Sequence, residues 1–294
     1  MSSPSLVSIG LPVRNAGPDV AAVVRSVLAQ DHERIELVIS DNASTDDTED
    51  VCRELARADG RISYYRQPEN IGLLNNFRAA LQLGRGEFFR WIGDDDELES
   101  TYVSRCLDVL ADPRLILVTT GIAYTSPDRA TESAVYHGTA LGSDNPVVRL
   151  REMLRLLGSS HLLMDPLYGL MRRDRVITIP RRNMLREDET FATKLALAGP
   201  WGHIPEVLAH RHWRTDRVGR LARRLDVPSW HAHFSSTLQC REMLSYLGQA
   251  GLTDAQQSQA RRAVYRMYAA RQQRTVSHRS RKLLRLATGR QVTP

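Results

Sequence analysis

Cysteine is scarce in this chain of 294 residues, and the three present, Cys52, Cys106 and Cys240, lie far apart. An odd number of scattered cysteines fits neither a disulfide framework nor the close spacing of a zinc site. We therefore expect three reduced thiols, as in a cytoplasmic protein. The N-terminus lacks a basic stretch followed by an apolar one, and no apolar run approaches bilayer length. These absences argue against secretion and against a membrane-spanning segment.

Acidic residues are absent from the last forty positions. From residue 255 onward there are ten Lys or Arg and no Asp or Glu, so the formal charge of +6 hides a body of 30 bases and 34 acids. Three interpretations of this basic tail stay open: a solvated helical face on the acidic body, a peripheral contact with anionic lipid, and a nucleic-acid patch. Aromatic residues are sparse there and no nucleic-acid motif occurs, so we expect no nucleic-acid partner.

Short apolar runs alternate with helical spacing through the first 120 residues. The pattern predicts strands at 6–11, 35–40, 62–65, 88–92 and 115–120, and helices at 20–30, 46–58, 74–83 and 100–110. Such alternation is typical of a mostly parallel sheet with helices on both faces. Further on we expect a surface loop at 126–145, helices at 147–157 and 187–198, a strand-like run from 204, and two or three helices after 229.

Polar clusters follow the first four predicted strands, at residues 12–15, 41–44, 70–72 and 94–97. In parallel sheets, ligands bind outside the carboxyl ends of the strands. The last cluster holds four consecutive acids, which repel one another unless they are exposed to water or gathered around a cation. Oxygen ligands of this kind suit Mg²⁺ or Mn²⁺. A solvated turn that caps the next helix is the alternative.

Four motifs occur in a fixed order: VSIGLPVRN at 7–15, ISDNASTD at 39–46, NIG at 70–72 and GDDD at 93–96. Together they resemble the nucleotide-sugar half of glycosyltransferase family 2. The resemblance implies an α/β GT-A fold, Rossmann-like, with a nucleotide-sugar half (1–125), an acceptor half (126–228) and a helical basic extension (229–294). It also implies a metal-dependent inverting transferase. The donor would be a nucleoside-diphosphate sugar, UDP-sugar favoured, and the acceptor a hydroxyl of a saccharide, a lipid-linked glycan or a small molecule.

Family analogy assigns the donor site residue by residue. The nucleotide-sugar contacts are expected from Pro12, Val13, Asn15, Asp41, Asn70, Gly72, Asn75, Asp94, Asp95 and Arg211, with Asp41 accepting a hydrogen bond from the base. A Mg²⁺ or Mn²⁺ ion is assigned to Asp96 first, then to Asp95 and Asp94, with His212. The acidic motif can be laid on Asp94 and Asp96, or on Gly93 and Asp95 with Asp96 trailing. The sequence therefore leaves open which of these carboxylates binds the metal.

A second acidic stretch, residues 187–189, opens a predicted helix that Gly199 closes. Capping alone can explain it, because acids at a helix N-terminus complement the helix dipole. The stretch resembles the acceptor half of the same family, in which an acidic pair opens such a helix and its aspartate is the catalytic base. This assigns Asp188 to that role, with Glu187 or Glu189 tuning or orienting it. The cluster at 210–214 contains Arg211 and His212. The sequence favours neither of two roles for it: a structural role, or contact with the diphosphate or the metal.

The sequence argues against two other functions. A nucleotidyltransferase of similar fold needs a glycine-rich basic loop after the first strand. Residues 12–17 hold one Arg and one Gly, which argues against it. A non-catalytic protein that binds nucleotide sugar or membrane is disfavoured by the combined presence of a metal motif and a candidate base. We expect a cytoplasmic location, with peripheral contact at the inner face of the membrane as the open alternative.

Overall fold

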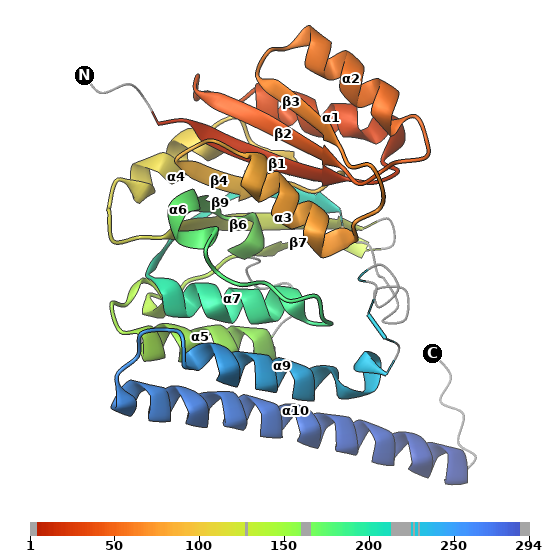
Figure 1. The fold of residues 1–294 in the computed structure, drawn as a ribbon. Helices are drawn as coiled ribbons and strands as arrows, with labels where there is room; N and C mark the ends of the chain where they lie inside the picture. The colour runs from red at the N-terminus through yellow and green to blue at the C-terminus, as the bar shows by residue number, and fades with distance from the viewer. Residues whose placement is uncertain are drawn as a thin grey trace.

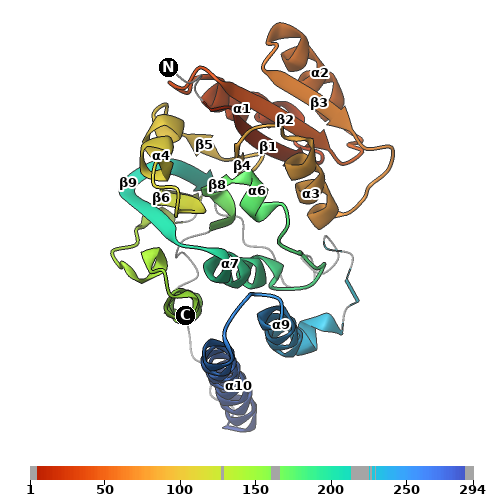
Figure 2. The same cartoon turned by 60° about the vertical axis from the view of Figure 1, so that its left-hand side comes forward.

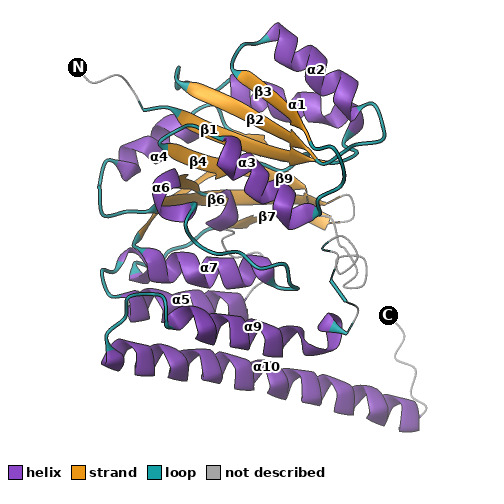
Figure 3. Ribbon diagram, in the orientation of Figure 1, coloured by secondary structure: helices purple, strands orange, loops and turns teal. Residues whose placement is uncertain are grey.

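The computed structural model describes residues 5–126, 129–159, 166–212, 225, 227–228 and 230–288. Within these ranges the strands form one mixed sheet in the order β3-β2-β1-β4-β8-β6-β9-β5, with β7 paired to β6 (Figures 1 and 3). The strands are β1 Val7–Val13, β2 Ile35–Asp41, β3 Ile62–Arg66, β4 Phe88–Trp91, β5 Glu97–Leu98, β6 Leu117–Ser126, β7 Arg129–Ala134, β8 Leu170–Arg172 and β9 Trp201–His212.

The direction of the strands fixes which loops share an edge. Strands β3, β2, β1 and β4 are mutually parallel, and the chain leaves β1 toward β2 on one side while β4 lies on the other. Strand β8 is antiparallel to both β4 and β6, so β6 runs with β4, and β9 is parallel to β6. The carboxyl ends of β1, β2, β4 and β9 therefore face one edge, at the switch point where α/β folds bind ligands.

Helices cover both faces of the sheet, as the sequence predicts. They are α1 Val20–Leu28, α2 Thr48–Ala58, α3 Leu73–Leu83, α4 Tyr102–Leu110, α5 Pro146–Ser159, α6 Arg173–Val176, α7 Glu187–Ala198, α9 His231–Leu247 and α10 Asp254–Thr288. One core joins β1 to α1, α2 and α4, and a second joins β4 to α3 and α7. Figure 2 shows α7, α9 and α10 stacked away from the sheet, at the opposite end from α2.

Strand β4 is buried on both faces because its side chains alternate between the two cores. Phe88 packs in the core with α1, whereas Phe89 and Trp91 pack in the core with α3 and α7. A Cβ at Gly10 on the neighbouring strand would lie 2.5 Å from the Phe89 ring, so glycine is required for this close approach. The packing fixes where β4 ends and the acidic residues begin.

One prediction in the second half is wrong in part. Residues 126–145 were expected to form a surface loop, but Arg129–Ala134 forms strand β7, antiparallel to β6. Its sequence, RATESA, lacks an apolar period because the strand pairs with only one neighbour among the described strands and does not need two buried faces. Backbone hydrogen bonds, which the apolar pattern does not report, hold it in place.

All three cysteines are free and buried, in agreement with the expected reduced thiols. Burial raises the pKa of Cys52 and of Cys106 to about 12, so these thiols stay protonated and unreactive at neutral pH. Among the described residues, no helix combines the length and the apolar character needed to cross a bilayer.

Two helices make up the described part of the tail. Met243 and Leu247 of α9 and Val264 of α10 are buried together with Leu150 of α5 and Leu197 of α7. The tail thus packs as a layer against α7, the helix whose first turn carries the predicted catalytic acids.

Candidate active site

The acidic loop after β4 folds back on itself. Asp96 is 1% exposed, and its Oδ2 accepts a hydrogen bond from the backbone N–H of Gly93 at 2.9 Å. A Cβ at position 93 would lie 2.9 Å from the same oxygen, which explains the glycine between the strand and the acids. The Oδ1 of Asp96 accepts from Nε of Arg211 at 3.2 Å. Both carboxylate oxygens of Asp96 therefore have partners within the chain.

The end of β9 meets this loop from the other side, so the basic cluster and the acidic loop form one site. The guanidinium of Arg211 lies 3.7 Å from the ring centre of Tyr168. His212 donates a hydrogen bond from Nδ1 to the backbone carbonyl of Asp95 at 2.7 Å. In the neutral imidazole the lone pair is then on Nε2, which is the arrangement found in metal-binding histidines.

The predicted metal residues do not form a cage made by the protein alone. Across the described ranges, which include Asp94, Asp95, Asp96 and His212, no group of three or more His, Cys, Asp or Glu is arranged to hold a metal ion. The physical reason is the orientation of Asp96, whose carboxylate is turned toward Gly93 and Arg211. Two protein ligands combined with substrate phosphates remain chemically adequate for Mg²⁺.

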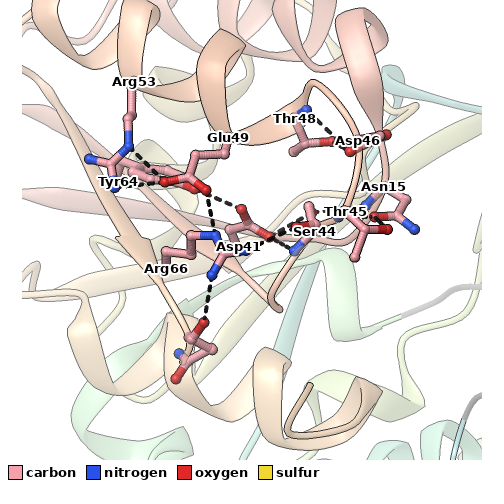
Figure 4. A network of polar contacts seen from close by, with 11 residues as sticks. Asn15, Asp41, Ser44, Thr45, Asp46, Thr48, Glu49, Arg53, Tyr64 and Arg66 are labelled. Carbon is pink, nitrogen blue, oxygen red and sulfur yellow. Dashed lines mark hydrogen bonds and ion pairs between the residues drawn. The ribbon is translucent and has the colours of Figure 1, made fainter. Parts of the chain in front are cut away.

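Asp41, at the end of β2, is completely buried. Its Oδ1 accepts hydrogen bonds from the backbone N–H and hydroxyl of Ser44, at 2.9 and 2.6 Å, and its Oδ2 accepts one from the Tyr64 hydroxyl at 2.7 Å. Figure 4 shows the carboxylate within this network. Burial and the Asp41 carboxylate together raise the pKa of Tyr64. Asp41 thus holds the loop after β2, and its contact with a base stays a prediction.

The loops after β1 and β2 are tied together. The backbone N–H of Asn15 donates to Oγ of Ser44 at 3.0 Å, and Oδ1 of Asn15 accepts from the N–H of Thr45 at 2.8 Å. Asn15 and Ala43 both adopt φ 54°, a left-handed conformation that residues with a Cβ rarely take. The side chain of Val13 packs in the core, so only its backbone is turned toward these loops.

Sequence reasoning missed two asparagines that tie together the ends of β1 and β2 and the loops that follow β2 and β3. Asn42 donates from Nδ2 to Oδ1 of Asn70 at 2.8 Å and accepts the N–H of Ile71 at the same distance. Buried Asn76 of α3 donates from Nδ2 to the carbonyl oxygen of Ser40 at 2.8 Å. An amide on the apolar face of the predicted helix 74–83 was the available signal. The predicted residue Asn75 instead donates to the carbonyl oxygen of Ile71, also at 2.8 Å.

The first turn of α7 holds three acids in three different surroundings. Glu187 is buried and accepts two hydrogen bonds from Arg181, at 2.7 and 2.5 Å. Glu189 is partly buried and has three partners, described below. Asp188 between them is exposed. The sequence alone does not distinguish the roles of these three carboxylates, whereas their different burial in the structure does.

Arg181 connects this turn to the end of β4. Its guanidinium lies 4.4 Å from the ring centre of Phe191 in α7 and 5.3 Å from that of Trp91 in β4. The two rings are 6.2 Å apart. Trp91 is four residues before Asp95, so the two acidic stretches share one aromatic support.

The sequence of the chain places it in a known family. Residues 8–177 match the family described as glycosyl transferase family 2, and the chain belongs to that family. The match covers the loops after β1, β2 and β4 and ends before Asp188. The expected GT-A fold is confirmed by solved structures. S. aureus TarS 1-349 in complex with UDP-GlcNAc has a TM-score of 0.68 at 16% identity, over 90% of this chain and 73% of that one.

Two curated relatives are named as bacterial glycosyltransferases. The chain is 28% identical over 123 residues to the putative teichuronic acid biosynthesis glycosyltransferase TuaG of Bacillus subtilis, covering 42% of this chain and 49% of TuaG. It is 33% identical over 99 residues to the GalNAc(5)-diNAcBac-PP-undecaprenol beta-1,3-glucosyltransferase of Campylobacter jejuni, covering 33% of this chain and 32% of that protein. The chain therefore spans about half or less of the length of these relatives.

Proposed function

We propose that the chain is an inverting glycosyltransferase that moves a sugar from a nucleoside-diphosphate sugar to an acceptor hydroxyl. The observation that carries the proposal is the hydrogen bond from His212 to the carbonyl of Asp95. It holds the imidazole against the backbone of the acidic loop, at the edge of the sheet where α/β folds bind nucleotides. A UDP-sugar is the favoured donor, because a structural neighbour was solved with UDP-GlcNAc.

A divalent metal fits the residues present. Asp95 and Nε2 of His212 would hold Mg²⁺ or Mn²⁺ together with the donor diphosphate, and Asp94 directly precedes Asp95 in the sequence. When bound, the ion supplies a Lewis acid beside the leaving phosphate. A neighbour at 15% identity and TM-score 0.53, a mannosyltransferase from Pyrobaculum calidifontis, was solved with GDP-Man and Mn2+. Asp96 takes a different part in this proposal: it orients Arg211, whose cation would face the diphosphate.

The pocket for the nucleotide is proposed between the loops after β1, β2 and β3. Pro12, the backbone of Val13, and Asn15 form one side, and Asn70, Gly72 and Asn75 form the other. Asp41 would act on the base side of this pocket through the loop that it holds, since its carboxylate is completely buried. These contacts rest on family analogy and on the hydrogen bonds that join the loops.

Asp188 is the proposed base. It takes the proton from the acceptor hydroxyl while the hydroxyl oxygen forms a bond to the anomeric carbon. On the opposite face, the bond from that carbon to the diphosphate oxygen breaks, and the nucleoside diphosphate leaves. Its exposure and its place on the first turn of α7 support this role, because a helix N-terminus favours a negative charge. Glu187, held by Arg181, would orient the turn.

A lipid-linked acceptor is the acceptor class that we favour, with peripheral contact at a membrane. The Campylobacter relative is named for an undecaprenol-linked substrate. Trp230 and Phe234, at the start of α9, are 50% and 54% exposed, and their ring centres lie 6.2 Å apart. Exposed aromatic rings on a helix that packs against the basic α10 suit a bilayer interface. Sedimentation with phosphatidylglycerol vesicles tests this contact, and Trp230→Ser with Phe234→Ser should abolish it.

Acceptor-dependent release of nucleoside diphosphate tests the proposed transfer. UDP-, GDP-, dTDP- and CDP-sugars are each supplied with Mn²⁺ and with a panel of saccharide and undecaprenyl-linked acceptors. One donor should be consumed in a reaction that EDTA stops, and the new glycosidic bond should have the inverted configuration by NMR. Retention of configuration, or full activity of Asp188→Asn, would contradict the proposal.

A further inference from the structure

The basic tail reaches the acidic turn of α7 through one arginine. Arg271, in the middle of α10, donates from Nη2 to Oε2 of Glu189 at 2.6 Å. The same oxygen accepts from Nε2 of Gln239 in α9 at 3.0 Å, and Oε1 accepts from Arg186 at 2.7 Å. Arg271 also donates from Nη1 to Oε1 of Gln239. Side chains from α9 and α10, together with Arg186 just before α7, thus bind the carboxylate of Glu189, which directly follows Asp188.

This contact is built into the packed interior. The side chain of Arg271 is 12% exposed and that of Glu189 is 22% exposed, while Gln239 is completely buried. An ion pair shielded from solvent in this way is screened less than a surface pair, and removing one partner is costly because it leaves the other charge poorly solvated. The other basic positions of α10 for which contacts are known do not reach α7. Arg274, one turn further on, donates to the carbonyl oxygen of Gly158 in α5 at 3.0 Å.

The contact lies in the first turn of α7, the turn that carries the proposed base Asp188. The first N–H groups of a helix have no partner within the helix, so the first turn opens most easily. Here that turn carries three adjacent acids, which repel one another. Arg181 neutralises Glu187 on one side, and Arg271 with Arg186 neutralises Glu189 on the other. Asp188 is thereby held between two fixed neighbours.

We propose that Arg271 is a positioning residue: the tail fixes the first turn of α7 through Glu189, and so sets the geometry of Asp188 toward the acceptor hydroxyl. This inference rests on the proposed function for its catalytic part only. General base catalysis requires hydrogen-bond reach to the proton that is removed, and a displacement of about 1 Å can cost about 100-fold in rate. The tail therefore contributes to turnover through packing rather than through its net charge.

The test compares Arg271→Met with Arg274→Met in the full chain. Both variants remove one arginine of α10 that donates to the end of α5, because Arg271 also contacts the carbonyl oxygen of Leu157 at 3.4 Å. Only the first removes a contact with α7. Folding should survive in both, since Lys194 of α7 still binds Glu242 of α9 at 2.8 Å. Arg271→Lys serves as the conservative variant.

Two measurements are made on each variant. Hydrogen exchange of amides 187–191 should accelerate about tenfold or more in Arg271→Met and stay within about twofold of the wild type in Arg274→Met. The kcat for transfer should fall about tenfold in Arg271→Met with the donor KM within about twofold, and Arg271→Lys should recover most of it.

Unchanged exchange in Arg271→Met would overturn the inference, and so would faster exchange with an unchanged kcat. Equal loss of activity in Arg274→Met would also overturn it, because that loss would reflect general destabilisation. The exchange measurement requires no turnover. Absence of transfer by the wild type would therefore count against the proposed function, while the exchange result still decides whether Arg271 fixes the turn.

Discussion

Arg211 and Asp96 are 115 residues apart in the chain and form an ion pair between Nε and Oδ1 at 3.2 Å. The pair joins the end of β9 to the acidic loop after β4. Because Asp96 is buried and Arg211 lies on the ring of Tyr168, the position of the arginine is defined by both sides. One acid of the triplet is thus used to orient a cation, which leaves Asp95 with His212 as the proposed metal residues.

Asp95→Asn and Asp96→Asn should therefore behave differently. Asp96→Asn removes the buried ion pair with Arg211 and should lower the free energy of unfolding by about 2–3 kcal/mol. Asp95→Asn should cost less stability than Asp96→Asn, because Asp95 is less buried, and should abolish metal-dependent nucleotide binding. Urea unfolding and titration with UDP and Mn²⁺ measure the two effects. Normal metal-dependent binding by Asp95→Asn would show that the assignment is wrong.

Asp188→Asn should lower kcat by about 100- to 10,000-fold, because the amide cannot accept the proton of the acceptor hydroxyl. Donor binding should stay within about twofold of the wild type. Asp174→Asn, at an exposed acid in α6, is the matched control and should keep full activity. Steady-state kinetics with the donor that the nucleotide-sugar screen selects measure both variants. A loss of more than tenfold in Asp174→Asn would mean that the effect of Asp188→Asn is not specific.

Asn42→Ala should loosen the pocket loop after β3. The change removes the acceptor of the Ile71 N–H and the donor to Asn70, and should cost about 1–3 kcal/mol in stability. The affinity for nucleotide should fall with it. Asn42→Asp keeps the acceptor and loses the donor, so its loss of affinity should be intermediate. Equal affinities for the two variants and the wild type in calorimetry would mean that this loop does not contact the nucleotide.

His203 should make stability depend on pH, far from the proposed site. Its Nε2 accepts from the N–H of Tyr136 at 3.1 Å and its Nδ1–H donates to Thr119 at 2.9 Å, so the folded state requires the neutral imidazole. Burial, and then His137, lower the pKa of His203 to about 4. Between about pH 6.5 and 4 the unfolded chain binds the extra proton, so stability is full above that window and falls as the pH is lowered through it.

The loss should reach about 2–3 kcal/mol at pH 4. His203→Gln keeps an acceptor and a donor without titrating, so its stability should change less between pH 7.5 and 4.5. Urea unfolding at the two pH values measures the difference. An equal decline in the variant would assign the pH dependence to other groups.

The sequence predicted positions well and orientations poorly. Strands β1 to β4 and the loops at their carboxyl ends follow from apolar periods and turn residues. The same pattern places Asp41 and Asp96 at the edge of the sheet, but it does not report that both carboxylates turn inward to bind Tyr64 and Arg211. Partners more than 20 positions away, together with hydrogen bonds from Ser44 and Gly93, set those orientations, and no apolar period encodes them.

The tail illustrates the same limit. Its composition left three interpretations open, one of them a helical face on the acidic body, but it did not indicate that Arg271 is largely buried and contacts Glu189, 82 residues earlier. Strand β7 was missed because a strand with a single neighbour needs no apolar period. Asn42 and Asn76 were missed because polar residues in loops and on helices are common, and only their partners reveal a role.

Calorimetric titration of UDP in the presence and absence of Mn²⁺, with wild type, Asp95→Asn and Asp188→Asn, tests the central claim most directly. The account predicts binding by the wild type that requires the metal, loss of that binding in Asp95→Asn, and unchanged binding in Asp188→Asn although transfer is lost. If neither UDP nor GDP, dTDP or CDP binds at saturating concentration, or if Asp95→Asn binds as the wild type does, the proposed donor site is contradicted.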